Sequence, residues 1–561
     1  MRTLNTTLAV VLAASLAGCA SDGTSTPQPT PTPAPQASKR PNVLLIVADD
    51  LGYSDIGAFG GEIHTPNLDA LANNGRLLTD FHTAPTCSPT RSMLLSGTDH
   101  HLAGLGTMAE MLPSAPHQQG KPGYEGYLNE RSLSIAELLK DAGYHTYAAG
   151  KWHLGLTEET SAKARGFESS YTLLQGGGSH FAPVAGKLQS YDAVTYRENG
   201  VIVTPPANFY STDFYTDKLI GYIDANKGDG KPFFAYAAYT APHWPLQATA
   251  DFIDRYQGKY DVGYDAIRDA RIAKQKALGV IPADFQPAAP LPASAGNPSW
   301  SQLTAPQKAL EARRMEIYAA MVENLDWNIG RLVQHLKDIG EYDNTFIFFM
   351  SDNGAEAGSG IFRDNADTDN SLANLGKSLS NVQYGKRWGE VGATPFRLYK
   401  GTSTEGGHRA PAIARLPKQT AAQSPLNRIA TVRDLAPTLL ELAKADNPGS
   451  SYKGKTINPI TGRSLLPALV GSSGDVHASG SVFADELFGS AWVRRDQWKL
   501  VWVEQPAGPG AWTLHNLASD GAEANDVSAA YPAIVTELKQ EWQRYIVGNG
   551  VVLAPTSGLN P

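Results

Sequence analysis

Four mainly apolar runs along the chain share one pattern: each resembles a buried strand and ends in polar or charged residues. Apolar residues without the alternation of a half-exposed strand are typical of strands covered on both faces of a parallel sheet. The runs are NVLLIVA before Asp49 and Asp50, HTYAAG before Lys151 and His153, FFAYAAYTAP before His243, and TFIFFMS before Asp352 and Asn353. The pattern predicts buried strands with polar chemistry at their carboxyl ends.

An amphipathic helix is predicted over residues 311–339, where apolar residues recur at steps of three and four and share one face. They are Met315, Tyr318, Val322, Leu325, Ile329, Leu332, Leu336 and Ile339. Gly340 is expected to end the helix, and the strand-like run TFIFFMS follows it. Helix followed by buried strand indicates an α/β fold with a large, mainly parallel, doubly wound sheet.

The polar strand ends are expected to meet, because ligands in open α/β sheets bind at the carboxyl edge of the strands. Each piece alone has an ordinary explanation. Asp49–Asp50 resembles a turn or a helix cap, Asp352–Asn353 a turn, and His243 a structural histidine beside Trp and Pro. Their joint occurrence favours a functional site.

The chemistry of this set divides in two. Asp49, Asp50, Asp352 and Asn353 offer oxygen only, which favours calcium or magnesium over zinc. Lys151, His153, His243, Arg91 and Lys400 are suited to hold and protonate an anion. The three carboxylates contribute three negative charges. A divalent cation, one arginine and two lysines contribute five positive charges. The net charge of +2 makes the site suited to an anionic ester.

Composition excludes several partners. The chain is 42% apolar and 18% charged, with a formal net charge of −8. Nothing in this balance favours nucleic acid or anionic lipid. A site for an anion in such an acidic protein requires positive groups to be concentrated locally.

The N-terminus has the layout of an export signal. Arg2 precedes an apolar run, Leu8 to Leu16, that is too short to span a bilayer. Leu16-Ala17-Gly18-Cys19 resembles a bacterial lipobox, in which the signal (residues 1–18) is removed and Cys19 is lipidated; an ordinary signal cleaved nearby is the alternative. Residues 19–38 are rich in Pro, Thr and Ser and are expected to form a flexible tether.

A domain boundary is expected near residue 470. Residues 39–470 carry the strand–helix alternation. Residues 471–561 contain short strand-like runs followed by the helix-like stretch AAYPAIVTELKQEWQRYIVG. The second segment therefore predicts a small antiparallel sheet with a packed helix.

Cys87 lies in CSPTRSMLLSG and is the only cysteine besides Cys19. Ser88 is a candidate helix cap, Pro89 suits the first helical position, and Gly97 is expected to end the helix. Cys87 is then either a small buried residue at a helix N-terminus or a thiolate nucleophile of lowered pKa paired with a histidine. These residues alone do not decide between the two.

The stretch Cys87-Ser88-Pro89-Thr90-Arg91 resembles the Cys-x-Pro-x-Arg signature of type I, formylglycine-dependent sulfatases. GYHTYAAGKWHLG resembles the second signature of the family, and VADDLG, TPNLDALANNG, APHW, SDNG and EGGHRAPA occur in the family's order. The resemblance runs from about residue 40 into the C-terminal domain. The pseudomonad-type bacterial arylsulfatases are the nearest branch.

This resemblance implies an alkaline-phosphatase-like fold and a role for each matched residue. Asp49, Asp50, Asp352 and Asn353 bind one calcium ion together with residue 87, which a maturation enzyme has converted from cysteine to formylglycine. Arg91, Lys151 and His153 hold the hydrated aldehyde. Lys151, Lys400 and His243 contact the sulfate, and His243 is the general acid.

The resulting prediction is a sulfate monoesterase, with aryl sulfates as substrates, anchored by lipid to the outer membrane on its periplasmic side, with the outside of the inner membrane as the alternative. Neither Ala20 nor Ser21 is an aspartate, which favours sorting to the outer membrane. Three rivals remain open: a phosphonate or phosphodiester hydrolase of the same fold, an unmodified binder of sulfated glycans, and a thiol hydrolase using Cys87 and His153. Residues 170–210, 250–305 and 355–395 are expected as long loops around the cleft, where substrate choice is set.

Overall fold

A nine-stranded mixed sheet forms the centre of the protein, in a computed structural model that describes residues 39–187, 194–294, 296–358, 364–471 and 475–560. Its strand order is β2-β10-β9-β1-β8-β4-β5-β6-β7. The five central strands run parallel, and the two strands at each edge pair antiparallel with their inner neighbours. The bounds are β1 (Asn42–Ala48), β2 (Arg76–Leu78), β4 (His145–Lys151), β5 (Ser169–Leu173), β6 (Tyr196–Glu198), β7 (Val201–Val203), β8 (Phe233–Ala238), β9 (Thr345–Ser351) and β10 (Ala412–Arg415). The predicted mainly parallel α/β sheet is confirmed.

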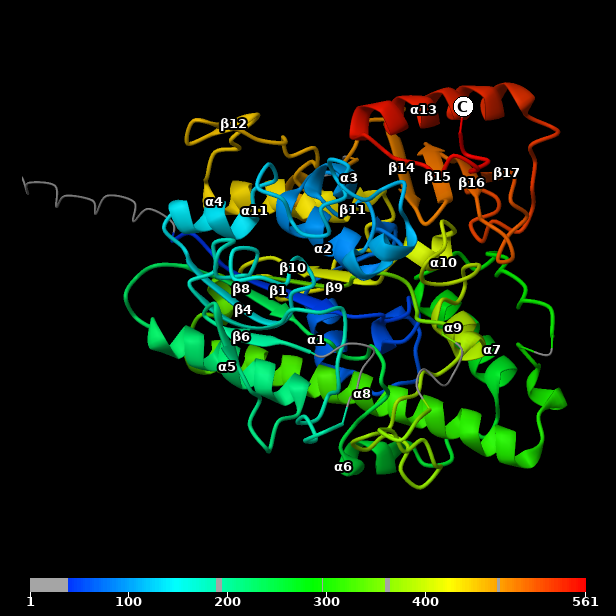
Figure 1. Ribbon diagram of the computed structural model, residues 1–561, viewed down its shortest axis with the longest axis horizontal. Coiled ribbons are helices and arrows are strands. Elements are labelled where there is room, and N and C mark those ends of the chain that lie inside the picture. The colour runs from blue at the N-terminus through cyan, green and yellow to red at the C-terminus, as the bar shows by residue number, and fades with distance from the viewer. Residues whose placement is uncertain (1–38, 188–193, 295, 359–363, 472–474, 561) are drawn as a thin grey trace, which may run out of the picture. The chain divides into compact units, whose positions relative to one another are not determined.

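Both faces of this sheet are covered, which explains why the central strands β1, β8 and β9 are almost continuously apolar. In β1, Leu44 and Ile46 belong to one hydrophobic core, while Val43, Leu45 and Val47 belong to the other. The helices around the first core include α1 (Pro66–Asn73), α5 (Ser211–Ala225), α7 (Tyr264–Leu278) and α8 (Ala305–Asp338). Those around the second include α2 (Cys87–Ser96), α4 (Ile135–Asp141) and α11 (Leu435–Ala443), which lie on the opposite side of the sheet in Figure 1.

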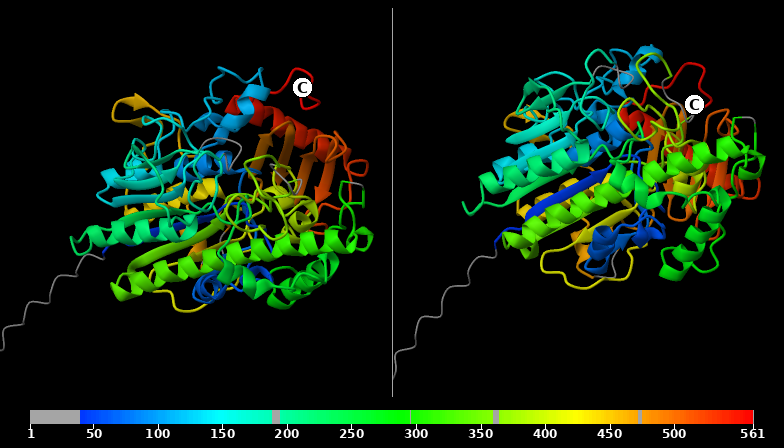
Figure 2. Two further views of the ribbon diagram at one scale, coloured as in Figure 1. Left: turned by 60° about the horizontal axis from the view of Figure 1, so that its bottom comes forward. Right: turned by 90° about the horizontal axis from the view of Figure 1, so that it is seen from below.

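Helix α8 is the amphipathic helix expected from the sequence, and it lies along one face of the sheet (Figure 2). It begins at Ala305, six residues before the predicted start, because Thr304 and Gln307 form a capping box and Pro306 lies in the first turn. Ile339 caps its C-terminal end, and Gly340 follows with a φ of 74°. The predicted helix is confirmed apart from its first turn.

Two local predictions are wrong. The N-cap of α2 is Thr86, and Cys87 is the first helical residue, so Ser88 does not cap the helix. The stretch 250–305 is not a long loop, because it contains α7, and the stretch 170–210 contains β5 to β7. Gly97 ends α2 in the left-handed conformation with a φ of 67°, as predicted.

The C-terminal part forms a second sheet of four antiparallel strands, in the order β14-β15-β16-β17. The strands are β14 (Val482–Leu487), β15 (Ser490–Arg495), β16 (Trp498–Trp502) and β17 (Trp512–Asn516), and α13 (Pro532–Asn549) covers one face (Figure 1). Leu538 and Trp542 of the helix pack with Val493, Leu500 and Leu514 of the strands. The predicted small antiparallel sheet with a packed helix is confirmed.

Residues from Arg40 onward form one compact unit, in which Lys499 of the C-terminal sheet forms a buried ion pair with Glu405 of the short helix α10 (Glu405–His408) that precedes β10. No helix among the described residues combines the length and apolar character needed to cross a bilayer. The expected signal, the lipidated Cys19 and the tether lie outside the described residues.

Candidate active site

The four predicted metal-binding residues come from the ends of two paired strands. Ala48 of β1 lies opposite Ser351 of β9, so Asp49–Asp50 and Asp352–Asn353 leave the sheet side by side. The backbone N–H of Asp50 donates to Asp352 Oδ1 at 3.2 Å, and Asn353 Nδ2 donates to Asp50 Oδ1 at 2.7 Å. All four side chains are fully buried. Asp50 has a φ of 66°, a left-handed conformation that costs a non-glycine residue energy and is commonly seen at functional sites.

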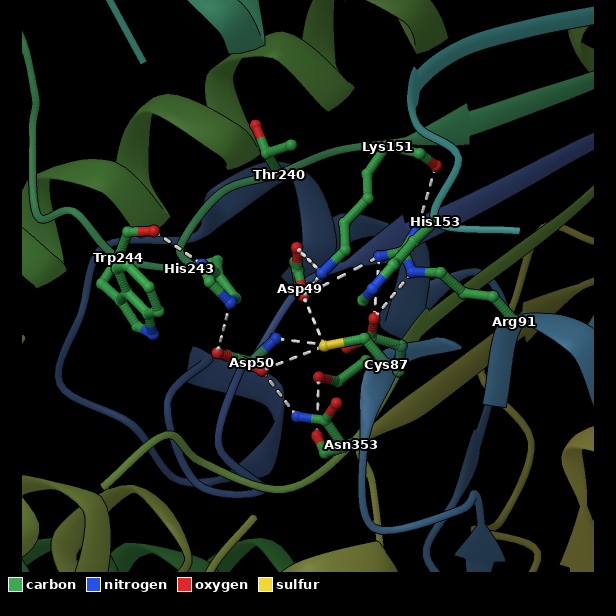
Figure 3. Close-up of polar contacts among 12 residues, drawn as sticks. Asp49, Asp50, Cys87, Arg91, Lys151, His153, Thr240, His243, Trp244 and Asn353 are labelled. Atoms are coloured by element: carbon green, nitrogen blue, oxygen red, sulfur yellow. Dashed lines mark hydrogen bonds and ion pairs between the residues drawn. The ribbon is translucent and has the colours of Figure 1, made fainter. Parts of the chain in front are cut away.

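Cys87 lies against these carboxylates, at the N-terminus of α2 (Figure 3). Its Sγ is 3.3 Å from Asp49 Oδ1 and 3.8 Å from Asp50 Oδ1. Burial and the charge of Asp352 raise the pKa of this thiol well above its ordinary value. This direction does not favour a thiolate nucleophile of lowered pKa, the basis of the thiol-hydrolase rival.

Arg91 is one turn further along α2 and is fully buried. Its Nε and one terminal nitrogen lie 2.9 and 2.8 Å from Asp352 Oδ2. Its other terminal nitrogen donates to the carbonyl of Lys151 at 3.1 Å and to the Tyr236 hydroxyl at 3.4 Å. Arg91 thus connects helix α2 to the ends of β9 and β4.

Two lysines pair with the two aspartates after β1. Lys151 Nζ, at the end of β4, lies 2.9 and 2.7 Å from the oxygens of Asp49. Lys400 Nζ lies 2.7 and 2.8 Å from the oxygens of Asp50. Burial by itself raises the pKa of Asp50, but Lys400, His243 and Lys151 outweigh it and lower that pKa far below the ordinary range. Asp50 is therefore ionised.

His243 approaches Asp50 from the loop after β8. Its Nδ1 lies 2.6 Å from the Trp244 carbonyl, which only accepts, so Nδ1 carries a proton. Its Nε2 lies 3.5 Å from Asp50 Oδ2. Burial lowers the pKa of His243 well below its ordinary value.

His153 belongs to the same region but has a different partner. Its Nε2 lies 3.1 and 3.2 Å from the two oxygens of Glu110. Nε2 of His153 is therefore engaged by Glu110 and not by the Cys87 thiol. All the predicted site residues in the described chain gather in one buried region.

Sequence reasoning missed Glu110, Tyr236 and Glu356. Glu110 lies in the 3-10 helix Ala109–Ser114, which no hydrophobic pattern marks. Tyr236 is inside β8, where it reads as another apolar strand residue. Glu356 is buried three residues after Asn353; burial raises its pKa to about 7, against the opposing effect of Lys400. The feature of the sequence that could have indicated Glu356 is its position directly after the motif SDNG, in SDNGAE.

The residues present fit a hard divalent cation. One ligand atom each from Asp49, Asp50, Cys87 and His243 lie within 4.8 Å of one another. Asn353 Oδ1 is buried and has no hydrogen-bond partner among the described residues. Burial and the nearby Asp49 raise the pKa of Asp352, as expected where carboxylates crowd together. Crowded carboxylates with an unsatisfied amide oxygen match the oxygen ligands that calcium and magnesium take.

Comparisons with a family model and with individual proteins all find sulfatases. The model of the Sulfatase family matches residues 41–445. The chain is 44% identical over 533 residues to an uncharacterized sulfatase of Schizosaccharomyces pombe, covering 92% of this chain and 95% of that protein. It is 40% identical over 441 residues to an arylsulfatase of Klebsiella aerogenes, covering 76% and 91%.

Solved structures show the same fold. Ps i-CgsB in complex with k-i-k-neocarrahexaose matches with a TM-score of 0.65 and 26% identity, covering 92% of this chain and 94% of that one. Phosphonate monoester hydrolase of Agrobacterium radiobacter matches with a TM-score of 0.55 and 20% identity, covering 91% and 96%, a likeness of fold alone. These matches confirm the expected alkaline-phosphatase-like architecture.

Proposed function

The chain belongs to the sulfatase family, whose members hydrolyse sulfate esters, and from this premise we propose that it is an arylsulfatase with one calcium ion and a formylglycine at position 87. The observation that carries the proposal is the position of Cys87. Its side chain is buried at a helix N-terminus, against Asp49 and Asp50 and close to the charges of Lys151 and Lys400. A buried thiol of raised pKa is a poor nucleophile, which supports assigning the nucleophile to a modified residue at this position.

Asp49, Asp50, Asp352 and Asn353 would hold the calcium ion, with residue 87 beside them. When bound, the ion supplies positive charge that stabilises an attacking oxygen and polarises a sulfate oxygen. Arg91 contributes by fixing Asp352 through two contacts to one carboxylate oxygen. The chain itself thus keeps the ligand set rigid.

A hydrated aldehyde at residue 87 offers one hydroxyl that attacks sulfur and a second that loses its proton when sulfate is released. Lys151 and Lys400 would bind the sulfate oxygens, since both ammonium groups lie at this edge of the sheet. His243 would donate a proton from Nε2 to the leaving oxygen, because its Nδ1 is held by the Trp244 carbonyl. Because burial lowers the pKa of His243, Nε2 is unprotonated in the free site and would have to take up a proton when the anionic ester binds. The net reaction converts a sulfate monoester and water to a phenol and inorganic sulfate.

The aryl preference is supported by the 40% identity to the Klebsiella aerogenes arylsulfatase. The charge balance of the site agrees with a monoanionic sulfate ester but does not by itself reject a phosphate. Turnover of p-nitrophenyl sulfate, p-nitrophenyl phosphate and bis-p-nitrophenyl phosphate therefore tests the proposal. We expect the highest kcat/KM with the sulfate, and no turnover by Cys87→Ala.

Higher kcat/KM with the phosphodiester would instead identify a phosphodiester hydrolase on the same fold. Binding of sulfated glycans without any turnover, by protein whose Cys87 remains unmodified in its native host, would identify a binding protein. Treatment with a chelator should abolish turnover, and calcium should restore it better than magnesium. Full activity after complete removal of bound metal would contradict the metal assignment.

We also propose export and anchoring to the outer membrane, on its periplasmic side, through a lipid on Cys19. The support is the sequence Leu16-Ala17-Gly18-Cys19 and the tether that follows it. Cys19→Ala should release the protein from the membrane fraction. Unchanged outer-membrane fractionation of that variant would overturn the anchor.

A further inference from the structure

His153 is held in an unusual way for a residue at the end of a strand. It follows β4 by two residues and has a φ of 56°, in the left-handed region. Its side chain is 7% exposed. Since a non-glycine residue rarely adopts this conformation without support, the contacts of its imidazole must help to hold it there.

The Nε2 atom of the imidazole forms its hydrogen bonds with Glu110. Both carboxylate oxygens lie within 3.2 Å of Nε2. Glu110 is 43 residues earlier in the chain, in the 3-10 helix Ala109–Ser114, and its side chain is 26% exposed. The contact therefore joins two segments that no strand pairing brings together.

The protonation of the pair follows from the chemistry of the two groups. Burial by itself raises the pKa of Glu110, but the charge of His153 and its hydrogen bond outweigh this and lower that pKa to about 2. An ionised carboxylate only accepts hydrogen bonds, so Nε2 of His153 must carry a proton. In the uncharged form of the ring, the lone pair is then on Nδ1. This atom is buried and has no hydrogen-bond partner within the described parts of the chain.

We propose that Glu110 is a positioning residue that holds His153 in one ring orientation and one tautomer, with Nδ1 left to accept a hydrogen bond from the hydroxyl groups of residue 87. This inference rests on the proposed function of the same site. Lys151, two residues earlier, is fixed separately by Asp49. The end of β4 thus presents two active groups, each oriented by its own carboxylate, in the way that a carboxylate orients the base of a hydrolytic triad.

The test compares Glu110→Ala with Glu110→Gln and with a control, Glu130→Ala, at an exposed glutamate outside the site. Each protein is used with its formylglycine content measured by mass spectrometry, and rates are divided by that content. Glu110→Ala should lower kcat about 10- to 100-fold, the usual range for the loss of an orienting partner. Its KM should change by less than about threefold, because ground-state binding of the sulfate does not involve Glu110. Glu110→Gln should fall between wild type and Glu110→Ala, since its amide oxygen still accepts from Nε2, and Glu130→Ala should match wild type.

A double-mutant cycle shows whether Glu110 acts through His153. In a His153→Ala background, Glu110→Ala should cause no further loss of kcat, because the group that it orients is gone. Equal losses in both backgrounds would overturn the proposal, and so would a Glu110→Ala enzyme with wild-type kcat.

The tautomer is measured without turnover, by ¹⁵N NMR of histidine-labelled protein, with the His153 signals identified from their absence in His153→Ala. Wild type should show a protonated Nε2 and a bare Nδ1, and Glu110→Ala should show both tautomers. A bare Nε2 in wild type would overturn the assignment. If wild type with full formylglycine hydrolyses no sulfate ester, the proposed function fails, while the NMR result still decides whether Glu110 fixes the ring.

Discussion

At the scale of single residues, the site is a balanced group of buried charges that the strand ends bring together. Asp49 pairs with Lys151, Asp50 with Lys400, and Asp352 with Arg91. A buried charge without a partner is costly, so each of these groups depends on its neighbour. The same pairing concentrates positive charge where an anionic ester is to be bound, although the whole chain is acidic.

Asn353 tests the metal assignment with the least disturbance of this balance, because it carries no charge. Asn353→Ala removes the amide oxygen that lacks a partner and the donor to Asp50 Oδ1. Calcium affinity, measured by isothermal titration, should fall at least about tenfold, as expected when support of a metal site is lost. Asn374→Ala, outside the site, is the control. Unchanged calcium affinity would exclude Asn353 as a ligand.

Most site residues were predictable from the sequence because each follows an apolar run or lies in a signature motif. Glu110 was not, since it lies in a short 3-10 helix without periodicity and acts only through a contact 43 residues away. Ser88 was misplaced as a helix cap for a physical reason. Serine and threonine both suit that position, and here the helix begins two residues earlier than predicted, at Cys87 after Thr86.

At the scale of elements, α2 carries both Cys87 and Arg91, so the way it ends affects the site. Gly97 closes the helix with a φ of 67°, and a Cβ at this position would lie 2.7 Å from Ala436 Cβ and 2.9 Å from a methyl of Ile460. The segment after the helix therefore packs closely against the region of α11. Only glycine meets both the conformational and the steric requirement.

Gly97→Ala should lower the free energy of unfolding by about 1–3 kcal/mol, through strain and overpacking together. The control is Gly449→Ala, which has a similar φ of 65° but no atom within 4 Å of the added Cβ. Urea unfolding of both variants separates the packing cost from the conformational cost. Equal losses in the two variants would show that the close packing at Gly97 has no energetic role.

The strands of the large sheet that were predicted are those buried on both faces, since their sequences are continuously apolar. The edge strands β2, β6 and β7 are only three residues long and carry no comparable signal. Their pairing is decided by distant segments, as in β2 with β10, where Leu78 pairs with Ala412, 334 residues later in the chain. Such long-range pairing leaves no recognisable pattern in the local sequence of either strand.

At the scale of the whole molecule, the C-terminal sheet is joined to the catalytic sheet by buried charges. Lys499 of β16 lies 2.7 Å from Glu405 and 2.8 Å from Glu523, with all three side chains buried. Glu405 belongs to EGGHR, a motif singled out from the sequence, and Gly407 in it accepts from the backbone N–H of Gly354, next to Asn353. The small sheet thus supports the segment that carries a predicted metal ligand.

Lys499→Met should lower the free energy of unfolding by about 3–5 kcal/mol, because two buried carboxylates lose their common partner. Arg495→Ala on the neighbouring strand is the control. It removes a more exposed pair with Glu537 and should cost less than about 1 kcal/mol. Similar small losses in both variants, measured by urea unfolding, would contradict the proposed support.

A second buried contact of the C-terminal sheet, with helix α3 (His100–Ala103), predicts the pH dependence of stability. His101 lies 3.0 Å from Asp99 and 3.2 Å from Glu486 of β14. Burial by itself lowers the pKa of His101, but its hydrogen bonds to Asp99 and Glu486 outweigh this and raise that pKa to about 10. The folded protein holds this proton more tightly than the unfolded chain does. The contribution of charged His101 to the free energy of unfolding is therefore complete below a pH of about 6.5 and is lost as the pH rises towards 10.

The free energy of unfolding should therefore decrease between pH 7 and pH 10 in wild type, and the decrease should be smaller in His101→Gln. Chemical unfolding at a series of pH values measures both slopes. Equal slopes in the two proteins would show that His101 is not charged in the folded state.

The central claim is that position 87 has a function only once it is no longer a cysteine. Mass spectrometry of the tryptic peptide Leu77–Arg91, from protein made in its native host, tests it directly. The account predicts a peptide whose mass is lowered by conversion of the thiol to an aldehyde, together with its hydrated form. An unmodified Cys87 that is fully alkylated in an active enzyme would contradict the account.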